Sequence, residues 1–305
     1  MTRGPANGIL RKLGVIFTIA TLATTLGGGC APDKPSNNDR LGVVVTILPQ
    51  VEFVEQVGGD RVAVTVMVPP GEEPHTYAPL TSQLQELSRA AMYAKVGSGV
   101  EFELVQMERL IEINPNMLVV DCAAGVTLQE MVTDVHNEDE HEHGATDPHI
   151  WMSPVNTAIM VQNICDGLIE LDPDHRDYYE QNCTAYLERL NGIDQTARES
   201  LAGITNRAFM TYHPAFGYLA RDYDLTMLPI EEEGKEATAA GLAHLITQAE
   251  EHDIKVIFAS PQFNPKSAEV IAEAIDGEVV FIDPLAQDYA DNLEGLLTEL
   301  ASALE

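Results

Sequence analysis

The stretch DPDHRDYYEQNCTAYLERLNGIDQTARESLA, residues 172–202, decides the fold. Its apolar residues recur mostly at helical intervals, which predicts one helix of roughly 45 Å at 1.5 Å per residue. Asp172 and Pro173 form a good start signal, because aspartate can cap free N–H groups and the first turn tolerates proline, which has none. A break near Gly192 is the alternative, since glycine inside a helix costs about 1 kcal/mol.

Eight short runs rich in β-branched residues lie on either side of this helix, four before it and four after it. They occupy residues 41–47, 61–68, 92–96, 117–121, 207–212, 225–230, 255–260 and 278–283. The runs alternate with helical patterns, which favours parallel sheets covered by helices. We therefore predict an α/β fold of two lobes, each with a four-stranded, mainly parallel sheet flanked by helices. One long rigid helix joins the lobes, and a single helical connection restricts hinge closure.

The first 29 residues have the features of a secretory signal. Three basic residues precede an apolar run, residues 13–26, that is too short to span a bilayer as a stable helix. Small residues before Cys30 indicate lipoprotein processing, in which this cysteine carries acyl chains, and ordinary cleavage nearby is the alternative. We expect an extracytoplasmic protein anchored to the outer face of the cell membrane through Cys30, or a periplasmic or secreted protein if Cys30 is not lipidated.

The remaining boundaries follow from composition and periodicity. Residues 30–40 are rich in proline and asparagine, which predicts a flexible tether. The first lobe is then expected at residues 41–172, the linking helix at residues 173–203 and the second lobe at residues 204–305.

The chain is strongly acidic, with a formal net charge of −31 that becomes −34 once the three basic residues of the signal are removed. This charge argues against a nucleic acid partner. A carboxylate-rich surface suits a salty medium, where screening reduces self-repulsion, or it raises the local concentration of cations. Beyond Cys30 the chain has Cys122, Cys165 and Cys183 and no CxxC, which leaves one disulfide with a leftover thiol, or three buried thiols.

Four side chains with metal-binding chemistry follow the predicted strands. His75 comes after the second run, His149 in the loop after the fourth, His213 at the end of the fifth and Asp283 at the end of the eighth. In open parallel sheets ligands bind beyond the carboxyl ends of the strands, so these residues are expected to face one cleft. Singly, each is more often a surface or turn residue. Together they form a complete four-ligand set for a borderline metal such as zinc.

The surroundings of His149 fit a rigid metal site. Pro148 and Pro154 restrict the backbone around it, and Trp151 is placed to form an apolar wall, although a plain core role is also compatible. Four protein ligands leave no position for water, which favours holding a metal over catalysis. The chain also contains no HExxH, GxSxG, Walker or GxGxxG motif, so we do not expect an enzyme.

The segment HNEDEHEHG, residues 136–144, lies just before this loop and carries His136, His141 and His143. Its composition is typical of a solvated loop. It is expected either to gather cations weakly and pass them to His149 or to be an acidic loop without that role.

Several motifs, in order, carry a resemblance to the metal-binding lipoproteins of zinc and manganese ABC importers. The motifs are PHTYAP, DPHIWMSP, ELDPDHRDYYEQN, TYHPAFGYLARDY, IEEEGKEATAAGLAHLI, FASPQFNPKSAEVIAEAI and VVFIDPLA. The resemblance runs from about Leu41 to the C-terminus and implies that the metal ligands are His75, His149, His213 and Asp283. Histidine at position 213 resembles the zinc-binding branch, since manganese-binding members tend to have glutamate there, and imidazole suits zinc better. Ala78, Pro214 and Ser260 depart from common family residues, which leaves selectivity open.

This resemblance implies an extracytoplasmic receptor that captures Zn²⁺ between two lobes and delivers it to the membrane subunit of an ABC-type metal permease. Mn²⁺ or Fe²⁺ is the alternative cargo, and we expect a monomer. A secreted metallohydrolase or a metal-stabilised adhesin is a rival from another class. Because metal binding requires unprotonated imidazoles, the affinity is expected to fall steeply below about pH 6.

Overall fold

A computed structural model describes residues 40–72, 74, 77–131, 146–231 and 237–305, all of which belong to one compact unit. The predicted signal, Cys30, His75 and the histidines at positions 136, 141 and 143 lie outside the described residues. Among the described residues, no helix combines the length and the apolar character needed to cross a membrane.

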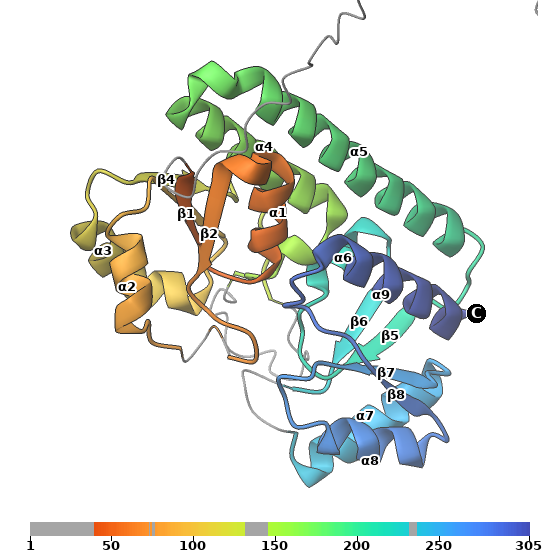
Figure 1. Cartoon of the computed structure of the whole chain (residues 1–305). Helices are drawn as coiled ribbons and strands as arrows, with labels where there is room; N and C mark the ends of the chain where they lie inside the picture. The colour runs from red at the N-terminus through yellow and green to blue at the C-terminus, as the bar shows by residue number, and fades with distance from the viewer. Residues whose placement is uncertain (1–39, 73, 75–76, 132–145, 232–236) are drawn as a thin grey trace, which may run out of the picture. The chain divides into compact units, whose positions relative to one another are not determined.

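The strands of the described chain form two four-stranded sheets in which every pair is parallel (Figure 1). The first sheet contains β1 (Leu41–Val45), β2 (Val62–Val66), β3 (Met92–Lys95) and β4 (Leu118–Asp121), in the order β2-β1-β3-β4. The second contains β5 (Ala208–Thr211), β6 (Thr226–Pro229), β7 (Val256–Ala259) and β8 (Glu278–Phe281), in the order β6-β5-β7-β8. Each predicted run contains one strand, and the predicted fold class is confirmed. The elements around the two sheets are called the first and second lobes below.

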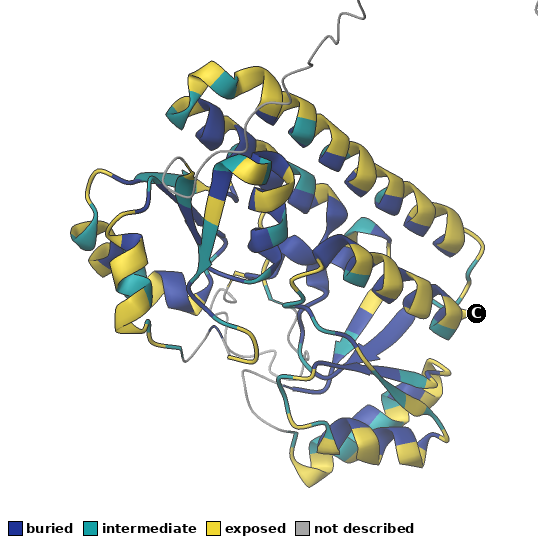
Figure 2. Ribbon diagram, in the orientation of Figure 1, coloured by how far each residue is buried: buried dark blue, intermediate teal, exposed yellow. Residues whose placement is uncertain are grey.

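Helices cover both sheets because the crossover between parallel strands places them on the sheet faces. The α-helices of the described residues are α1 (Pro49–Gly58), α2 (Thr81–Leu87), α3 (Glu101–Ile113), α4 (Pro154–Leu171), α5 (Arg176–Leu201), α6 (Gly217–Asp222), α7 (Ala239–Glu251), α8 (Lys266–Ala274) and α9 (Tyr289–Leu304). Short 3₁₀ turns are η1 (Gly59–Arg61), η2 (Ile150–Met152) and η3 (Pro173–His175). The central strands β1, β3, β5 and β7 and the inner faces of the helices are mostly buried, whereas the outer strands are partly exposed (Figure 2).

The long helix α5 is continuous over 26 residues, or about 39 Å. It runs through Gly192, where an added Cβ would meet nothing within 4 Å, so the predicted alternative of a broken helix is wrong. The helix packs on α1 and α4 of the first lobe and on α9, which follows the second sheet (Figure 1). A linking role for this helix therefore has direct packing support at both lobes. The predicted boundaries at residues 41–172, 173–203 and 204–305 stay a prediction.

The start of the long helix differs from the expected cap. The side chain of Asp172 makes no capping hydrogen bond, and a 3₁₀ turn precedes α5. Instead, the carboxylate accepts hydrogen bonds from Arg61 at 2.9 Å and from the hydroxyl of Tyr179 at 2.8 Å, and it lies 2.8 Å from Nδ1 of His175. The expectation that Asp172 caps the helix was wrong because these partners occupy its oxygens.

Asp172→Asn is expected to lower the free energy of unfolding at pH 7 by about 1–3 kcal/mol, because it breaks a mostly buried ion pair. Burial alone would raise the pKa of Asp172, but hydrogen bonds from His175, Tyr179 and Arg61 outweigh it and hold this pKa below its usual value. A lowered carboxyl pKa gives stability above the unfolded pKa that is lost as pH falls through the folded one. The deficit of the variant should therefore shrink below about pH 4 in urea titrations.

The exposed neighbour Asp174 supplies the control for this change. Asp174→Asn should leave the unfolding free energy nearly unchanged at both pH values. A deficit for Asp172→Asn that is the same at pH 7 and pH 3 would contradict the ionic explanation.

Two hydrophobic clusters stabilise the described chain. The larger one is shared between the first lobe, α5 and α9, and it also includes Phe209 and Phe258 of the second sheet. The smaller one lies between the other side of the second sheet and helices α7 and α8. The larger cluster therefore joins both lobes through packed side chains.

The sequence left open whether the three cysteines after Cys30 form one disulfide or remain three buried thiols. Cys122, Cys165 and Cys183 are all free and buried. Burial raises the pKa of Cys122, which keeps it a thiol. The prediction of three buried thiols is the one that the structure supports.

Candidate metal centre

The loop between β4 and α4 holds His149 in a buried position. The residue is 5% exposed, and Nδ1 of its ring lies 2.8 Å from Oδ1 of Asp147, which is fully buried. The same oxygen accepts the backbone N–H of His149 at 2.9 Å, and Gln129 donates to the other carboxylate oxygen at 3.3 Å. This arrangement favours hydrogen on Nδ1, so that Nε2 presents its lone pair to the cleft.

His213 follows β5 and has an analogous partner. Its Nδ1 lies 3.2 Å from Oε2 of Glu231, which is the second residue after β6 and is 6% exposed. Phe263 stacks on the imidazole, with ring centroids 4.8 Å apart and planes inclined by 24°. The hydroxyl of Thr211 donates to the carbonyl of His213 at 3.1 Å. The backbone carbonyl, the ring face and Nδ1 of His213 each have a contact, and together these contacts fix the direction of its Nε2.

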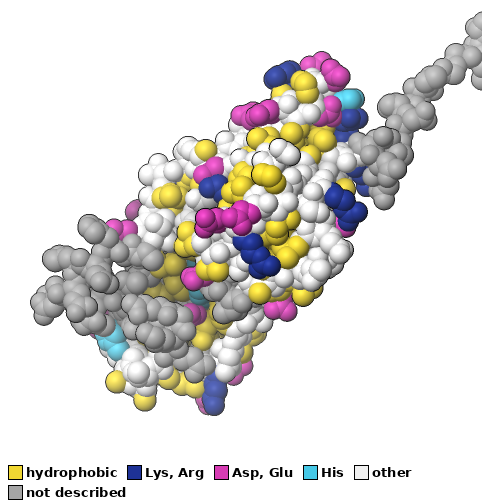
Figure 3. Space-filling model, turned by 90° about the vertical axis from the view of Figure 1, so that its left-hand side faces the viewer, with side chains coloured by type: hydrophobic (Ala, Val, Ile, Leu, Met, Phe, Trp, Pro, Cys, Tyr) yellow, Lys and Arg dark blue, Asp and Glu magenta, His cyan; other side chains and the backbone are white. Residues whose placement is uncertain are grey.

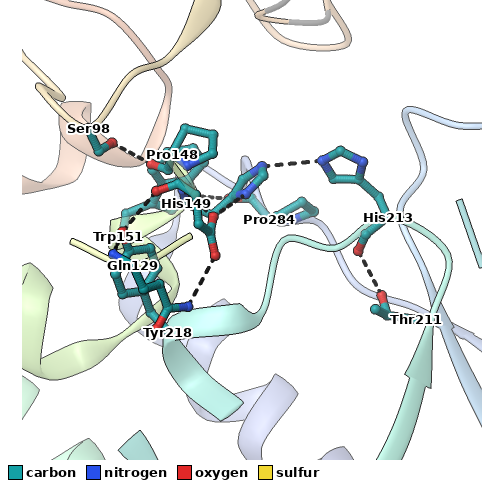
Figure 4. A network of polar contacts seen from close by, with 10 residues as sticks. Ser98, Gln129, Pro148, His149, Trp151, Thr211, His213, Tyr218 and Pro284 are labelled. Carbon is teal, nitrogen blue, oxygen red and sulfur yellow. Dashed lines mark hydrogen bonds and ion pairs between the residues drawn. The ribbon is translucent and has the colours of Figure 1, made fainter. Parts of the chain in front are cut away.

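The two imidazoles point their Nε2 atoms at each other across 3.2 Å (Figure 4). Two nitrogen ligands of a tetrahedral zinc ion, each at 2.0–2.1 Å, are about 3.3–3.4 Å apart. A direct hydrogen bond between the rings would need a proton on one Nε2, whereas the two carboxylates favour the hydrogen on Nδ1 of both rings. The pair therefore has the spacing and the lone-pair direction that a bound cation requires.

Asp283 follows β8, but its carboxylate is engaged within the second lobe. Oδ1 accepts hydrogen bonds from Nε2 of Gln262 at 2.6 Å and from the backbone N–H of Leu285 at 2.8 Å. Ser260, one of the departures from the family pattern, donates in turn to the side-chain oxygen of Gln262. The role of Asp283 as a metal ligand stays a prediction.

Within the residues that the structure describes, no group of three histidine, cysteine, aspartate or glutamate residues is placed to hold a metal ion. The structure thus brings together two of the four predicted ligands, His149 and His213. His75 lies outside the described residues, as do the histidines of the acidic segment 136–144.

A pocket at this point is lined from both lobes. Pro74, Pro148 and Trp151 contribute from the first lobe and its loop, and Gln262, Phe263 and Pro284 contribute from the second. Trp151 lies 5.3 Å from the ring of His149 and is also part of the larger core cluster, so both interpretations of this residue hold. The apolar lining strengthens electrostatic attraction between the imidazoles and a cation by limiting water.

Sequence reasoning missed Asp147 and Glu231. Glu231 is the second residue after β6, and Asp283, which was identified by its place at a strand end, is likewise the second residue after β8. Asp147 stands two residues before His149, a spacing that permits a carboxylate to reach both the ring and the backbone N–H. Glu231 could have been found by asking which carboxylates follow the predicted strand ends, whereas Asp147 could have been found only from its spacing to His149.

The fold and the site together define a class: two-lobed binding proteins with one linking helix and a histidine-lined cleft. The chain belongs to the family described as zinc-uptake complex component A, periplasmic, whose model matches residues 43–303.

Individual relatives agree with this assignment. The high-affinity zinc uptake system protein ZnuA of Bacillus subtilis is 32% identical over 275 residues, which cover 87% of this chain and 82% of that protein. The zinc-binding lipoprotein AdcA of Streptococcus pneumoniae is 27% identical, and the match covers 97% of this chain but only 58% of that longer protein. A crystal structure of ZnuA is 40% identical with a TM-score of 0.81, covering 88% of this chain and 100% of the other.

Proposed function

We propose that this protein is an extracytoplasmic receptor that captures Zn²⁺ in the cleft between its lobes and delivers it to an ABC-type metal permease. The observation that carries the proposal is the pair of buried imidazoles, His149 and His213, whose Nε2 atoms lie 3.2 Å apart with a carboxylate behind each ring. Membership of the zinc-uptake family and the zinc-uptake and zinc-binding names of the relatives support the cargo.

The proposed ligand set is His75, His149, His213 and Asp283. Three neutral imidazoles and one carboxylate suit zinc better than manganese, which prefers oxygen ligands. Asp147 and Glu231 add two buried carboxylates next to the imidazoles and offset the remaining positive charge of the bound ion. Four protein ligands leave no exchangeable water, so we propose a binding protein rather than a hydrolase.

The site is proposed to work on the outer side of the membrane. Lipidation of Cys30 would anchor the protein as a monomer near its permease, and acylation can be tested from the mass of the mature N-terminal peptide. The segment with His136, His141 and His143 is proposed to gather cations weakly for the central site. On the face shown in Figure 3, basic side chains are scattered and do not form a continuous patch, which agrees with a cation rather than a nucleic acid as ligand.

Protein purified without added metal is expected to bind one Zn²⁺ per chain and to retain it in the presence of excess Mn²⁺ or Fe²⁺. Zn²⁺ is preferred because imidazole ligands suit it better than Mn²⁺, and because complexes of Zn²⁺ are generally more stable than those of Mn²⁺ or Fe²⁺. Bound metal should also raise the melting temperature, because a ligand present at 100 times its Kd stabilises the folded state by about 2.7 kcal/mol. Metal analysis and competitive titration give the measurement, and displacement of zinc by equimolar Mn²⁺ would contradict the proposed cargo.

A further inference from the structure

The loop that carries His149 is bonded to the second lobe as well as to the first. The indole N–H of Trp151 donates to the carbonyl of Pro284 at 2.8 Å, and the hydroxyl of Tyr289 donates to the carbonyl of Trp151 at 2.6 Å. Trp151 lies two residues after His149, and Pro284 directly follows Asp283. Trp151 is thus hydrogen-bonded to two residues that follow β8, to Pro284 through its side chain and to Tyr289 through its backbone carbonyl.

Tyr289 is buried at this contact and belongs to the first turn of α9. Its hydroxyl lies 2.8 Å from the hydroxyl of Thr157 in α4, and its ring meets that of Phe53 in α1 edge to face, with centroids 4.8 Å apart. Burial raises the pKa of Tyr289, so the hydroxyl keeps its proton and stays a donor. A second-lobe side chain is therefore inserted between two helices of the first lobe.

A carboxylate strengthens the same contact. The backbone N–H of Ala290, at the start of α9, faces the two oxygens of Glu52 in α1 at 3.3 and 3.4 Å. Tyr186 of α5 donates to the same carboxylate at 2.7 Å. A negative group at a helix N-terminus is favourable, so Glu52 holds the start of α9 against the first lobe and the long helix.

The opposite side of the loop has a matching bond. Tyr218 of α6 donates to the carbonyl of Asp147 at 2.9 Å, and Ser98 of the first lobe donates to the carbonyl of Pro148 (Figure 4). The loop is thus bonded to both lobes on either side of His149. Parting the lobes here would leave several buried polar groups without partners, which is costly.

We propose that Trp151 and Tyr289 are positioning residues that hold the His149 loop against the second lobe, so that the spacing between His149 and His213 is set before metal arrives. Lobe separation at this point is then no part of metal uptake. If the imidazoles are already correctly spaced in the metal-free protein, the apparent zinc affinity is higher, because every molecule is in a conformation that can bind the metal. The claim about affinity rests on the proposed function, whereas the claim about lobe spacing does not.

Tyr289→Phe tests this, since it keeps the ring and removes only the hydroxyl. The matched control is Tyr179→Phe, which removes the hydroxyl of another buried tyrosine, and the bonds of that hydroxyl to Asp172 and Arg61 lie within the first lobe and the start of the long helix. Both variants should lose some thermal stability. Only Tyr289→Phe should weaken Zn²⁺ binding, by about 10-fold, as the loss of one or two buried hydrogen bonds populates separated states.

Lobe spacing is measured in the same variants by electron–electron double resonance. Spin labels are attached to cysteines introduced at two exposed positions, Gln85→Cys in α2 and Glu273→Cys in α8. The substitution Cys30→Ser prevents labelling at position 30, and the other three native cysteines are buried. The parent protein should give one narrow distance, the same with and without Zn²⁺, and Tyr289→Phe should broaden it in the metal-free state. A shift of the parent distance on adding Zn²⁺, or equal zinc affinity and spacing in the Tyr289 and Tyr179 variants, would overturn the proposal. Absence of Zn²⁺ binding by the parent protein would instead refute the proposed function, while the metal-free distances still decide the positioning role.

Discussion

His213→Ala is expected to lower the affinity for Zn²⁺ by about 100- to 1,000-fold. Metal binding by a four-ligand zinc site is worth about 10–16 kcal/mol, so the loss of one ligand removes roughly 3–4 kcal/mol. The side chain is 12% exposed and faces the cleft, where it contacts Phe263, Glu231 and His149. Removing it should therefore leave both lobes folded. Isothermal titration with a competing chelator measures the affinity, and circular dichroism measures the fold.

The exposed His252 at the end of α7 provides a matched control. His252→Ala should bind zinc as tightly as the parent protein. An unchanged zinc affinity in His213→Ala would show that this imidazole is not a ligand. Loss of the folded state would show that it is a core residue instead.

Asp147→Asn is expected to weaken zinc binding by about 10- to 100-fold, the usual effect of removing a carboxylate that orients a metal-binding histidine. The carboxylate bonds both Nδ1 and the backbone N–H of His149 and accepts from Gln129. An amide at this position would present its N–H₂ group to one of these donors, and it would remove the negative charge that supports the bound cation. The expected loss is smaller than for His213→Ala, because the ligand atom itself remains.

Asp166→Asn is the control for this change. Asp166 also accepts a hydrogen bond from a glutamine amide, that of Gln162, but on an exposed part of α4. Its replacement should leave the zinc affinity unchanged. If both variants lose stability equally and neither loses affinity, Asp147 has only a structural role. Glu231→Gln should behave like Asp147→Asn, since Glu231 faces Nδ1 of His213 in the same manner.

The strands and the long helix could be predicted because their signals are local. Burial alternates with a period that the backbone conformation sets, so the runs of β-branched residues and the helical spacing in residues 172–202 indicate their elements directly. The lack of a cap by the side chain of Asp172 could not be predicted in this way, because one of its partners is Arg61, 111 residues away. The carboxylate could bond either the free backbone N–H groups at the helix start or other side chains, and the completed fold brings Arg61 within reach.

The candidate site was predictable in part for a related reason. The rule that polar residues at strand ends face one cleft identified His149 and His213, whose Nε2 atoms the structure places together. The rule names residues but not the orientation of their side chains, so it did not predict that the carboxylates of Asp147 and Glu231 lie next to Nδ1 of the two rings. It also did not show that the carboxylate of Asp283 accepts from Gln262.

The sequence by itself determined the α/β class, the four-and-four division of the strands, the linking helix and the residue types able to bind a metal, because each depends on the chemistry and spacing of nearby residues. Only the tertiary structure decided that the cysteines of the described chain are free thiols and that two carboxylates orient the imidazoles. It alone also decided that Trp151 is bonded to Pro284 and Tyr289, which are 133 and 138 residues away. Such contacts arise from the packing of the whole chain, which brings together groups that no local pattern connects.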